Sequence, residues 1–285
     1  MPGDEWLYYK IYSGPKFLEE LLLNQIYDLT HLLKANAQID KFFFIRYSDD
    51  DGYHLRIRYH FTDAGNICNA LGLVTEMMGP FVENRIVWKI CIDSYSRELE
   101  RYGKDAIELV ETVFDISSFR VISHLRESAG EQNEDERWLQ GVIFVENILN
   151  ILEFTNEQKR DLYNRFYESY CLEFKPERPT KDYLKNKFRE QSSNIARKLS
   201  GFVRDKAGPD FCRLKEPVIS LANLHRGSSP LDSLGSLLYS IFHMHFNRLF
   251  LSRSRACEFV IYYLMGAYYS SVIGKTKSLT SKNPN

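Results

Sequence analysis

The sequence has few cysteines, and none of them stand at a metal-binding spacing. Its five cysteines are widely separated and form no CxxC pair: Cys68, Cys91, Cys171, Cys212 and Cys257. An odd and scattered set argues against a disulfide framework and against a zinc site. We therefore predict a reducing, cytoplasmic location and no bound metal.

Motifs that bind nucleotides or activate common nucleophiles are also absent. The chain has no glycine-rich nucleotide loop, no P-loop, no HExxH and no GxSxG. Each of these motifs supplies a specific phosphate, zinc or nucleophile geometry. A redox or metal enzyme is not expected, and we predict no cofactor.

Charge of one sign and long apolar runs are lacking as well. The formal net charge is -1, so no global field attracts nucleic acid or an anionic membrane. The first residues, MPGDEWLYYKIYSG, do not resemble a signal peptide. The apolar stretch Cys257–Ile273 carries Glu258 and four tyrosines, which favours a buried helix over a membrane span. Anion binding, if present, must be local.

Hydrophobic periodicity predicts an α+β fold with a ferredoxin-like N-terminal region. Expected strands are Trp6–Tyr12, Phe42–Tyr47, Tyr53–Phe61 and Arg85–Ile92, with helices over Phe17–Leu33 and Asn66–Met78. The β-α-β-β-α-β order gives an antiparallel sheet with both helices on one face. We assign residues 1–102 to this region.

The rest of the chain is predicted to be mostly helical. Expected helices are Lys104–Phe114, Phe119–Ser128, Glu136–Ile151, Asn156–Phe174, Lys181–Phe202, Pro230–Phe250 and Ser254–Ser270. Thr155 is the expected N-cap of one of them. We predict that residues 103–274 pack on the first region as one functional unit, and that residues 275–285 form a disordered tail.

The predicted hairpin carries the first candidate site. Strand alternation puts His54, Arg56, Arg58 and His60 on one face. Together with Arg46 on the neighbouring strand, these arginines would bind a carboxylate or a phosphate well. The alternative is a solvated sheet face with acidic cross-strand partners.

Two further stretches contain candidate residues. In the first, Tyr95 precedes Arg101 and Gly103 at a strand-to-helix junction, where helix N–H groups favour anions. The alternative there is a structural salt bridge of Arg101. In the second, His243 and Asn247 share a helix face at i and i+4, and histidine is a common general acid or base. The alternative is a structural helix histidine.

These stretches, in this order, resemble the C-terminal elimination domain of class I lanthipeptide dehydratases. IRY followed by HLRIR is similar to its R-Y-x-D-P…H-L-R-L-R, and YSRELERYG to its Y-x-x-E-x-x-R-Y-G-G. HMHFNRL looks like its H-M-x-x-N-R-L. Lys104 replaces the second glycine, and the proline after the acidic turn is missing. The likeness extends from about Trp6 to Gly266 and includes free-standing domains of thiopeptide-type bacteriocin biosynthesis.

The resemblance implies glutamate elimination from glutamylated Ser or Thr of a precursor peptide. On the matching positions Arg46 and Arg101 would hold the glutamyl group, and His243 would be the acid/base. The expected substrate-binding residues are His54, Arg56, Arg58, Tyr95, Asn247 and Arg248. The implied partners are a precursor peptide, with leader and glutamylated core, and a separate tRNA-dependent glutamylating subunit. A homodimer is left open, and no direct contact with nucleic acid is expected.

Two alternatives remain. Some relatives in this resemblance are thiopeptide pyridine synthases, which join two dehydroalanines by a formal [4+2] cycloaddition. The chain would otherwise be a non-catalytic subunit that binds the precursor peptide, for example by strand addition to an exposed sheet edge.

Overall fold

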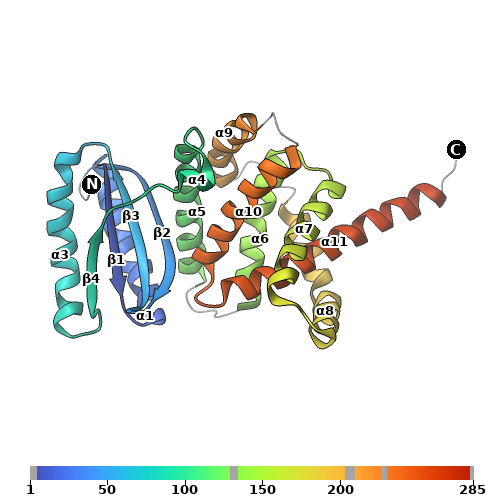
Figure 1. The fold of residues 1–285 in the computed structure, drawn as a ribbon, viewed down its shortest axis with the longest axis horizontal. Coiled ribbons are helices and arrows are strands. Elements are labelled where there is room, and N and C mark those ends of the chain that lie inside the picture. The colour runs from blue at the N-terminus through green and yellow to red at the C-terminus, as the bar shows by residue number, and fades with distance from the viewer. Residues whose placement is uncertain (1–4, 129–133, 203–208, 226–229, 283–285) are drawn as a thin grey trace. The chain divides into compact units, whose positions relative to one another are not determined.

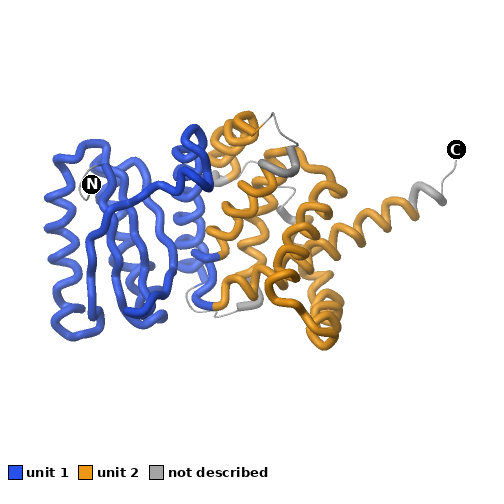
Figure 2. The backbone as a smooth tube through the Cα atoms, in the orientation of Figure 1, with its two compact units in different colours: residues 1–132, 247–252 blue, residues 133–246, 253–285 orange. Residues whose placement is uncertain are grey.

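A computed structural model describes residues 5–128, 134–202, 209–225 and 230–282 (Figure 1). Packing divides the chain into two units, coloured separately in Figure 2. Unit 1 comprises residues 1–132 and 247–252, and unit 2 comprises residues 133–246 and 253–285. The predicted boundary was at residue 102. The observed division differs because the long helix after residue 102, Ile107–Glu127, packs on the sheet of unit 1.

Unit 1 contains a four-stranded antiparallel sheet. Its strands are β1 (Trp6–Tyr12), β2 (Ile39–Asp49), β3 (Gly52–Phe61) and β4 (Lys89–Asp93), in the order β2-β3-β1-β4. The chain is thus a mixed helical and sheet protein, as predicted. Strand β4 begins later than expected, because Ile86 and Val87 still bond to the Phe81 carbonyl at the end of the preceding helix.

The helices of unit 1 differ from the prediction in several places. They are α1 (Pro15–Leu21), α2 (Tyr27–Ala35), α3 (Ile67–Glu83), α4 (Leu99–Tyr102) and α5 (Ile107–Glu127). A π-helical turn, Leu22–Ile26, joins α1 to α2, and a 3-10 turn, Ala64–Asn66, precedes α3. Helix α3 continues through Pro80, and α5 is one helix where two were predicted. Asp115 and Ser118 lie between the two predicted helices. Both are buried and bond to β2, and these contacts keep them helical.

Helix α5 covers part of the outer edge of β2. The Phe42 N–H donates to the Asp115 carboxylate at 2.9 Å, and the Phe44 N–H donates to the Ser118 hydroxyl at 3.3 Å. Asp115 also pairs with Lys34 of α2 at 2.8 Å. Side chains of α5 therefore replace a further strand as partners of β2.

The two faces of the sheet have different chemistry. One face carries the buried apolar residues Leu55 and Ile57, and Tyr59, whose hydroxyl lies 3.2 Å from Thr30 of α2. We call the other the cationic face and define it by Lys10, His54, Arg56 and Arg58, which the strand register places together. The alternation predicted for β3 is thus observed.

Unit 2 is helical in its described residues. Its helices are α6 (Glu134–Ile151), α7 (Asn156–Phe174), α8 (Arg178–Phe202), α9 (Pro209–Leu224), α10 (Pro230–Leu249) and α11 (Ser254–Lys282), and the last turn of α10 belongs to unit 1. Thr155 caps α7 in a full capping box, as predicted.

Two features of unit 2 were not expected. Helix α9 was not predicted, and it begins at Pro209, a residue type that fits a first helical turn. Helix α11 continues to Lys282, into the region predicted as a polar tail. No helix in the described ranges has the length and apolar character needed to cross a bilayer.

Candidate functional site

Arg58 lies in the middle of the cationic face, enclosed by aromatic rings. Its guanidinium carbon is 4.3 Å from the ring centre of Tyr8, 4.9 Å from that of Tyr95 and 5.2 Å from that of Phe43. Arg58 is 8% exposed, and its Nε has no hydrogen-bond partner among the described residues. Burial lowers the pKa of Arg58. A buried cation without a bound carboxylate is costly unless a ligand supplies the anion.

Arg56 and His54 form a connected pair beside Arg58. The Arg56 guanidinium stacks 3.6 Å from the Tyr47 ring centre, and its Nε donates to His54 Nε2 at 3.1 Å. His54 Nδ1 lies 3.2 Å from the Gly52 carbonyl, so it carries the proton and donates there. Burial lowers the pKa of His54, which is 1% exposed. His54 therefore acts as a neutral support for Arg56.

Arg46 does not join this group, which corrects the predicted constellation. In the β2–β3 register Arg46 is opposite Leu55, and paired residues share a face. Its side chain lies on the helix-covered face, where Nη2 is 2.7 Å from Glu19 and Nε donates to the Arg248 carbonyl at 2.9 Å. Arg46 is thus engaged by protein groups on the side of the sheet opposite Arg58.

Asn247 and Arg248 complete the cover of the β2 edge. The Arg46 N–H donates to Asn247 Oδ1 at 3.0 Å, and Asn247 Nδ2 donates back to the Arg46 carbonyl at 2.9 Å. The fully buried Arg248 donates from Nε to the Phe44 carbonyl at 2.8 Å. Both residues were expected to bind substrate. These contacts give them a structural role instead.

We expect Asn247→Leu to lower the free energy of unfolding by about 2 kcal/mol, since two hydrogen bonds to the main chain are lost. Urea unfolding followed by circular dichroism measures this. The exposed Asn186→Leu on α8 is the control and should change stability by less than about 0.5 kcal/mol. An unchanged midpoint for Asn247→Leu would contradict the structural role.

Arg101 lies in an exposed ion pair with Glu98. Its Nη1 is 3.1 Å from Glu98 Oε2, and the two side chains are 50% and 57% exposed. The expected alternative of a salt bridge is therefore observed, but an exposed pair contributes little and is readily exchanged. Burial lowers the pKa of Arg58, and the negative charge of Glu98 offsets part of that lowering. The sequence reasoning assigned no role to this shared neighbour.

His243 belongs to a buried polar cluster in unit 2. Its Nδ1 lies 2.9 Å from Oε1 of Glu258, a carboxylate that is fully buried. Tyr170 donates to Glu258 Oε2 at 2.9 Å, and Tyr262 lies 3.4 Å from the same oxygen. The carboxylate accepts here, so Nδ1 carries a proton, and in the neutral form of this 23% exposed imidazole the free lone pair is on Nε2.

The sequence reasoning missed the role of Glu258. The available signal was its position as the sole acidic residue in the apolar stretch Cys257–Ile273. A carboxylate in such a stretch is buried only with partners. Arg46 and Arg101 belong to unit 1 and His243 belongs to unit 2, and the convergence of the three residues stays a prediction.

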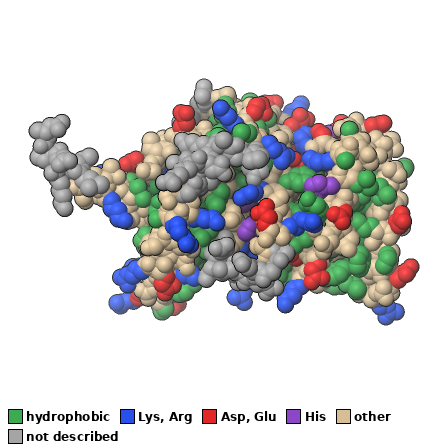
Figure 3. Space-filling view, turned by 180° about the vertical axis from the view of Figure 1, so that it is seen from behind, with side chains coloured by type: hydrophobic (Ala, Val, Ile, Leu, Met, Phe, Trp, Pro, Cys, Tyr) green, Lys and Arg blue, Asp and Glu red, His purple; other side chains and the backbone are tan. Residues whose placement is uncertain are grey.

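Other site chemistry finds little support in the described residues. No group of three or more His, Cys, Asp or Glu side chains there is placed to hold a metal ion. On the face in Figure 3, basic and acidic side chains are interspersed, as the net charge suggests.

Comparison with known sequences agrees with the family resemblance of the sequence motifs. The family described as lantibiotic biosynthesis dehydratase C-term matches residues 6–269. The nisin biosynthesis protein NisB of Lactococcus lactis subsp. lactis is 28% identical over 274 residues, which cover 95% of this chain and 26% of NisB. The chain spans about a quarter of the length of the curated relatives it matches.

Two solved structures share the fold. The tRNA-dependent lantibiotic dehydratase MibB from Microbispora sp. 107891 has a TM-score of 0.72 and 20% identity, over 96% of this chain and 29% of MibB. The pyridine synthase TbtD from thiomuracin biosynthesis has a TM-score of 0.68 and 13% identity, over 95% of this chain and 99% of TbtD.

Proposed function

This chain belongs to the family of lantibiotic biosynthesis dehydratase C-terminal domains, and we therefore propose that it eliminates glutamate from glutamylated Ser or Thr of a precursor peptide. The product is dehydroalanine or dehydrobutyrine, which makes the chain a lyase. The observation that carries this proposal is Arg58, a buried guanidinium with aromatic walls and no ion-pair partner in the described residues. Such a group suits the free carboxylate of a glutamyl ester and the second carboxylate that elimination releases.

The residues supply each element of the reaction. His243 Nε2 takes the α-proton, the electrons of that bond form the Cα=Cβ double bond, and the Cβ–O bond breaks to release glutamate as a carboxylate. Arg58 and Arg101 hold the glutamyl group and stabilise the charge that develops on it. Glu258 keeps the His243 proton on Nδ1. Arg58 replaces Arg46 in this assignment, because Arg46 is bound to Glu19.

The organisation of the system is part of the same proposal. A separate tRNA-dependent subunit adds glutamate, and the precursor peptide, with leader and core, passes between the two proteins. We also infer a ferredoxin-like arrangement for unit 1, which the order β2-β3-β1-β4 and the antiparallel neighbours support. Arg56, with His54 behind it, and Tyr95 complete the substrate-binding set.

A pyridine synthase is the second candidate. The observation in its favour is the fold, which this chain shares with TbtD over 95% of its residues at a TM-score of 0.68. Cycloaddition of two dehydroalanines requires no glutamate-binding arginine, so it leaves the buried Arg58 without an assigned role. Elimination therefore remains the better supported function.

Mass spectrometry of a cognate peptide, glutamylated beforehand, tests the proposal. We expect incubation with the protein to remove glutamate and leave the peptide one water lighter than its unmodified form at each site, because elimination takes the Ser or Thr oxygen with glutamate. Peptide without protein is the control. An unchanged glutamylated peptide would refute the proposal. Conversion of a peptide that already contains dehydroalanine, with release of the leader, would establish the pyridine synthase.

A further inference from the structure

The two edges of the sheet differ in how their main chain is covered. On β2 the outward N–H and C=O groups are bonded to the side chains of Asp115, Ser118, Asn247 and Arg248. Strand β4 is at the other end of the sheet, and no strand of the described residues lies outside it. Uncovered edge strands pair readily with another extended chain, and proteins usually protect them. Within the described residues, one edge of the sheet is thus covered and the other has no partner strand.

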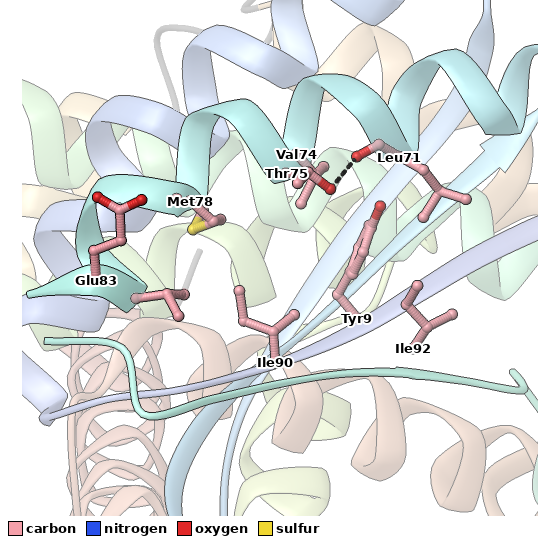
Figure 4. Close-up of a pocket in the computed structure, with 10 residues that line it drawn as sticks. Tyr9, Leu71, Val74, Thr75, Met78, Glu83, Ile90 and Ile92 are labelled. Atoms are coloured by element: carbon pink, nitrogen blue, oxygen red, sulfur yellow. Dashed lines mark hydrogen bonds between the residues drawn. The ribbon is translucent and has the colours of Figure 1, made fainter. Parts of the chain in front are cut away.

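An apolar groove runs beside the open edge. It lies between α3 and the sheet and has a volume of about 470 Å³. Tyr9, Ile90 and Ile92 line it from the strands, as Figure 4 shows, with α3 opposite them. Ile92 is 50% exposed, and Val82, at the end of α3, is 46% exposed. The groove therefore offers apolar surface directly next to unpaired strand main chain.

One charged residue lines this groove. Glu83 is exposed at the end of α3, and no cation forms an ion pair with it in the described part of the chain. Figure 4 shows Glu83 and Ile92 towards opposite ends of the groove, with Ile90 between them. The groove is thus complementary to an apolar segment with a cation at one end.

We propose that the β4 edge binds an extended segment of the peptide substrate, antiparallel to β4, with a basic residue next to Glu83. In an added strand, alternate side chains lie on the same side as Ile90 and Ile92 and enter the groove. The remaining side chains lie on the side of the cationic face. Strand β4 leads directly into the segment with Tyr95 and Arg101, so the bound peptide reaches the proposed site along the chain. This inference rests on the proposed function.

The test uses an inert probe, a fluorescein-labelled peptide of sequence Val-Thr-Val-Thr-Val-Thr-Lys-amide. Because the probe is expected to run antiparallel to β4, its C-terminal lysine would lie next to Glu83. Fluorescence anisotropy should show saturable binding. A probe with N-methyl groups on alternate residues should bind at least about tenfold more weakly, because it cannot donate to the strand main chain.

Two variants locate the site. Ile92→Lys should weaken binding by about tenfold or more, because it places a charge in the groove. Leu172→Lys, at an 80% exposed position on α7, is the matched control and should bind as the unaltered chain does. Glu83→Gln should weaken binding of the lysine probe but not of a probe that ends in glutamine. Circular dichroism melting confirms that each variant is folded.

Three outcomes would overturn the inference. They are equal binding of the N-methylated probe, no effect of Ile92→Lys, and a concentration-dependent dimer that Ile92→Lys abolishes. The last would assign the β4 edge to a second copy of the chain. Because the probe carries no glutamyl group, its binding is independent of elimination. Failure here with normal glutamate release would leave the proposed function intact.

Discussion

Replacing Glu258 with glutamine should lower the rate of glutamate elimination by about a hundredfold or more, as expected when the partner of a catalytic histidine is changed to an amide. The glutamine amide donates to Nδ1, so the His243 proton moves to Nε2. That nitrogen then lacks the lone pair needed to take the α-proton. Single-turnover glutamate release measures the effect, with His243→Ala as the reference for complete loss of the base.

A control variant separates the effect of Glu258→Gln on catalysis from its effect on stability. Glu146 is the matched control, since it is also buried in unit 2 and accepts from the hydroxyls of Tyr163 and Tyr269. Glu146→Gln should reduce stability but not the rate per folded molecule. For Glu258→Gln we expect kcat to fall with little change in KM, since His243 acts in the chemical step. An unchanged kcat would remove Glu258 from the mechanism.

Replacing Arg58 with glutamine should reduce elimination by about a hundredfold, the scale seen when a donor to a developing anion is lost. We expect the free energy of unfolding to change by no more than about 1 kcal/mol. Relief of the buried charge offsets the loss of the contacts with Tyr8, Tyr95 and Phe43. Glutamate release and urea unfolding are measured on the same preparations.

Arg46→Gln is the comparison, and the opposite pattern is expected. It breaks the 2.7 Å pair with Glu19 and the bond to the Arg248 carbonyl, so stability should fall by about 2 kcal/mol. The rate per folded molecule should change less than for Arg58→Gln. If Arg46→Gln stops elimination while Arg58→Gln does not, the glutamate site lies on the other face of the sheet.

The contrast between these arginines shows how far sequence reasoning reaches. The period of two within β3 placed Arg56 and Arg58 together, because it needs only the strand itself. Arg46 is on another strand, and its face depends on register. The Asp49–Gly52 pairing leaves a two-residue turn and sets Arg46 opposite Leu55. The sequence reasoning assumed a five-residue turn, which left the register undefined, and a shift of one residue changes the face.

The features that the sequence did not predict depend on contacts between residues far apart in the chain. The pairing of His243 with Glu258 joins two helices, and no local pattern encodes which carboxylate meets which imidazole. Helix α5 remains continuous because Asp115 and Ser118 bind β2, so tertiary contacts outweigh the local preference of these residues for turns. Capping, by contrast, is local, and Thr155 was predicted correctly.

The cover of the β2 edge also has a consequence for the order of folding during synthesis. Asn247 bonds to Arg46 across 201 residues of sequence, and Arg248 bonds to Phe44 across 204. Contacts of such high contact order form late. A nascent chain of residues 1–132 would therefore carry a β2 edge that α5 covers only in part while the ribosome translates most of unit 2. The β2 edge can mispair until residues 247–252 emerge from the ribosome. Packing of this short segment on β2 therefore completes the folding of unit 1.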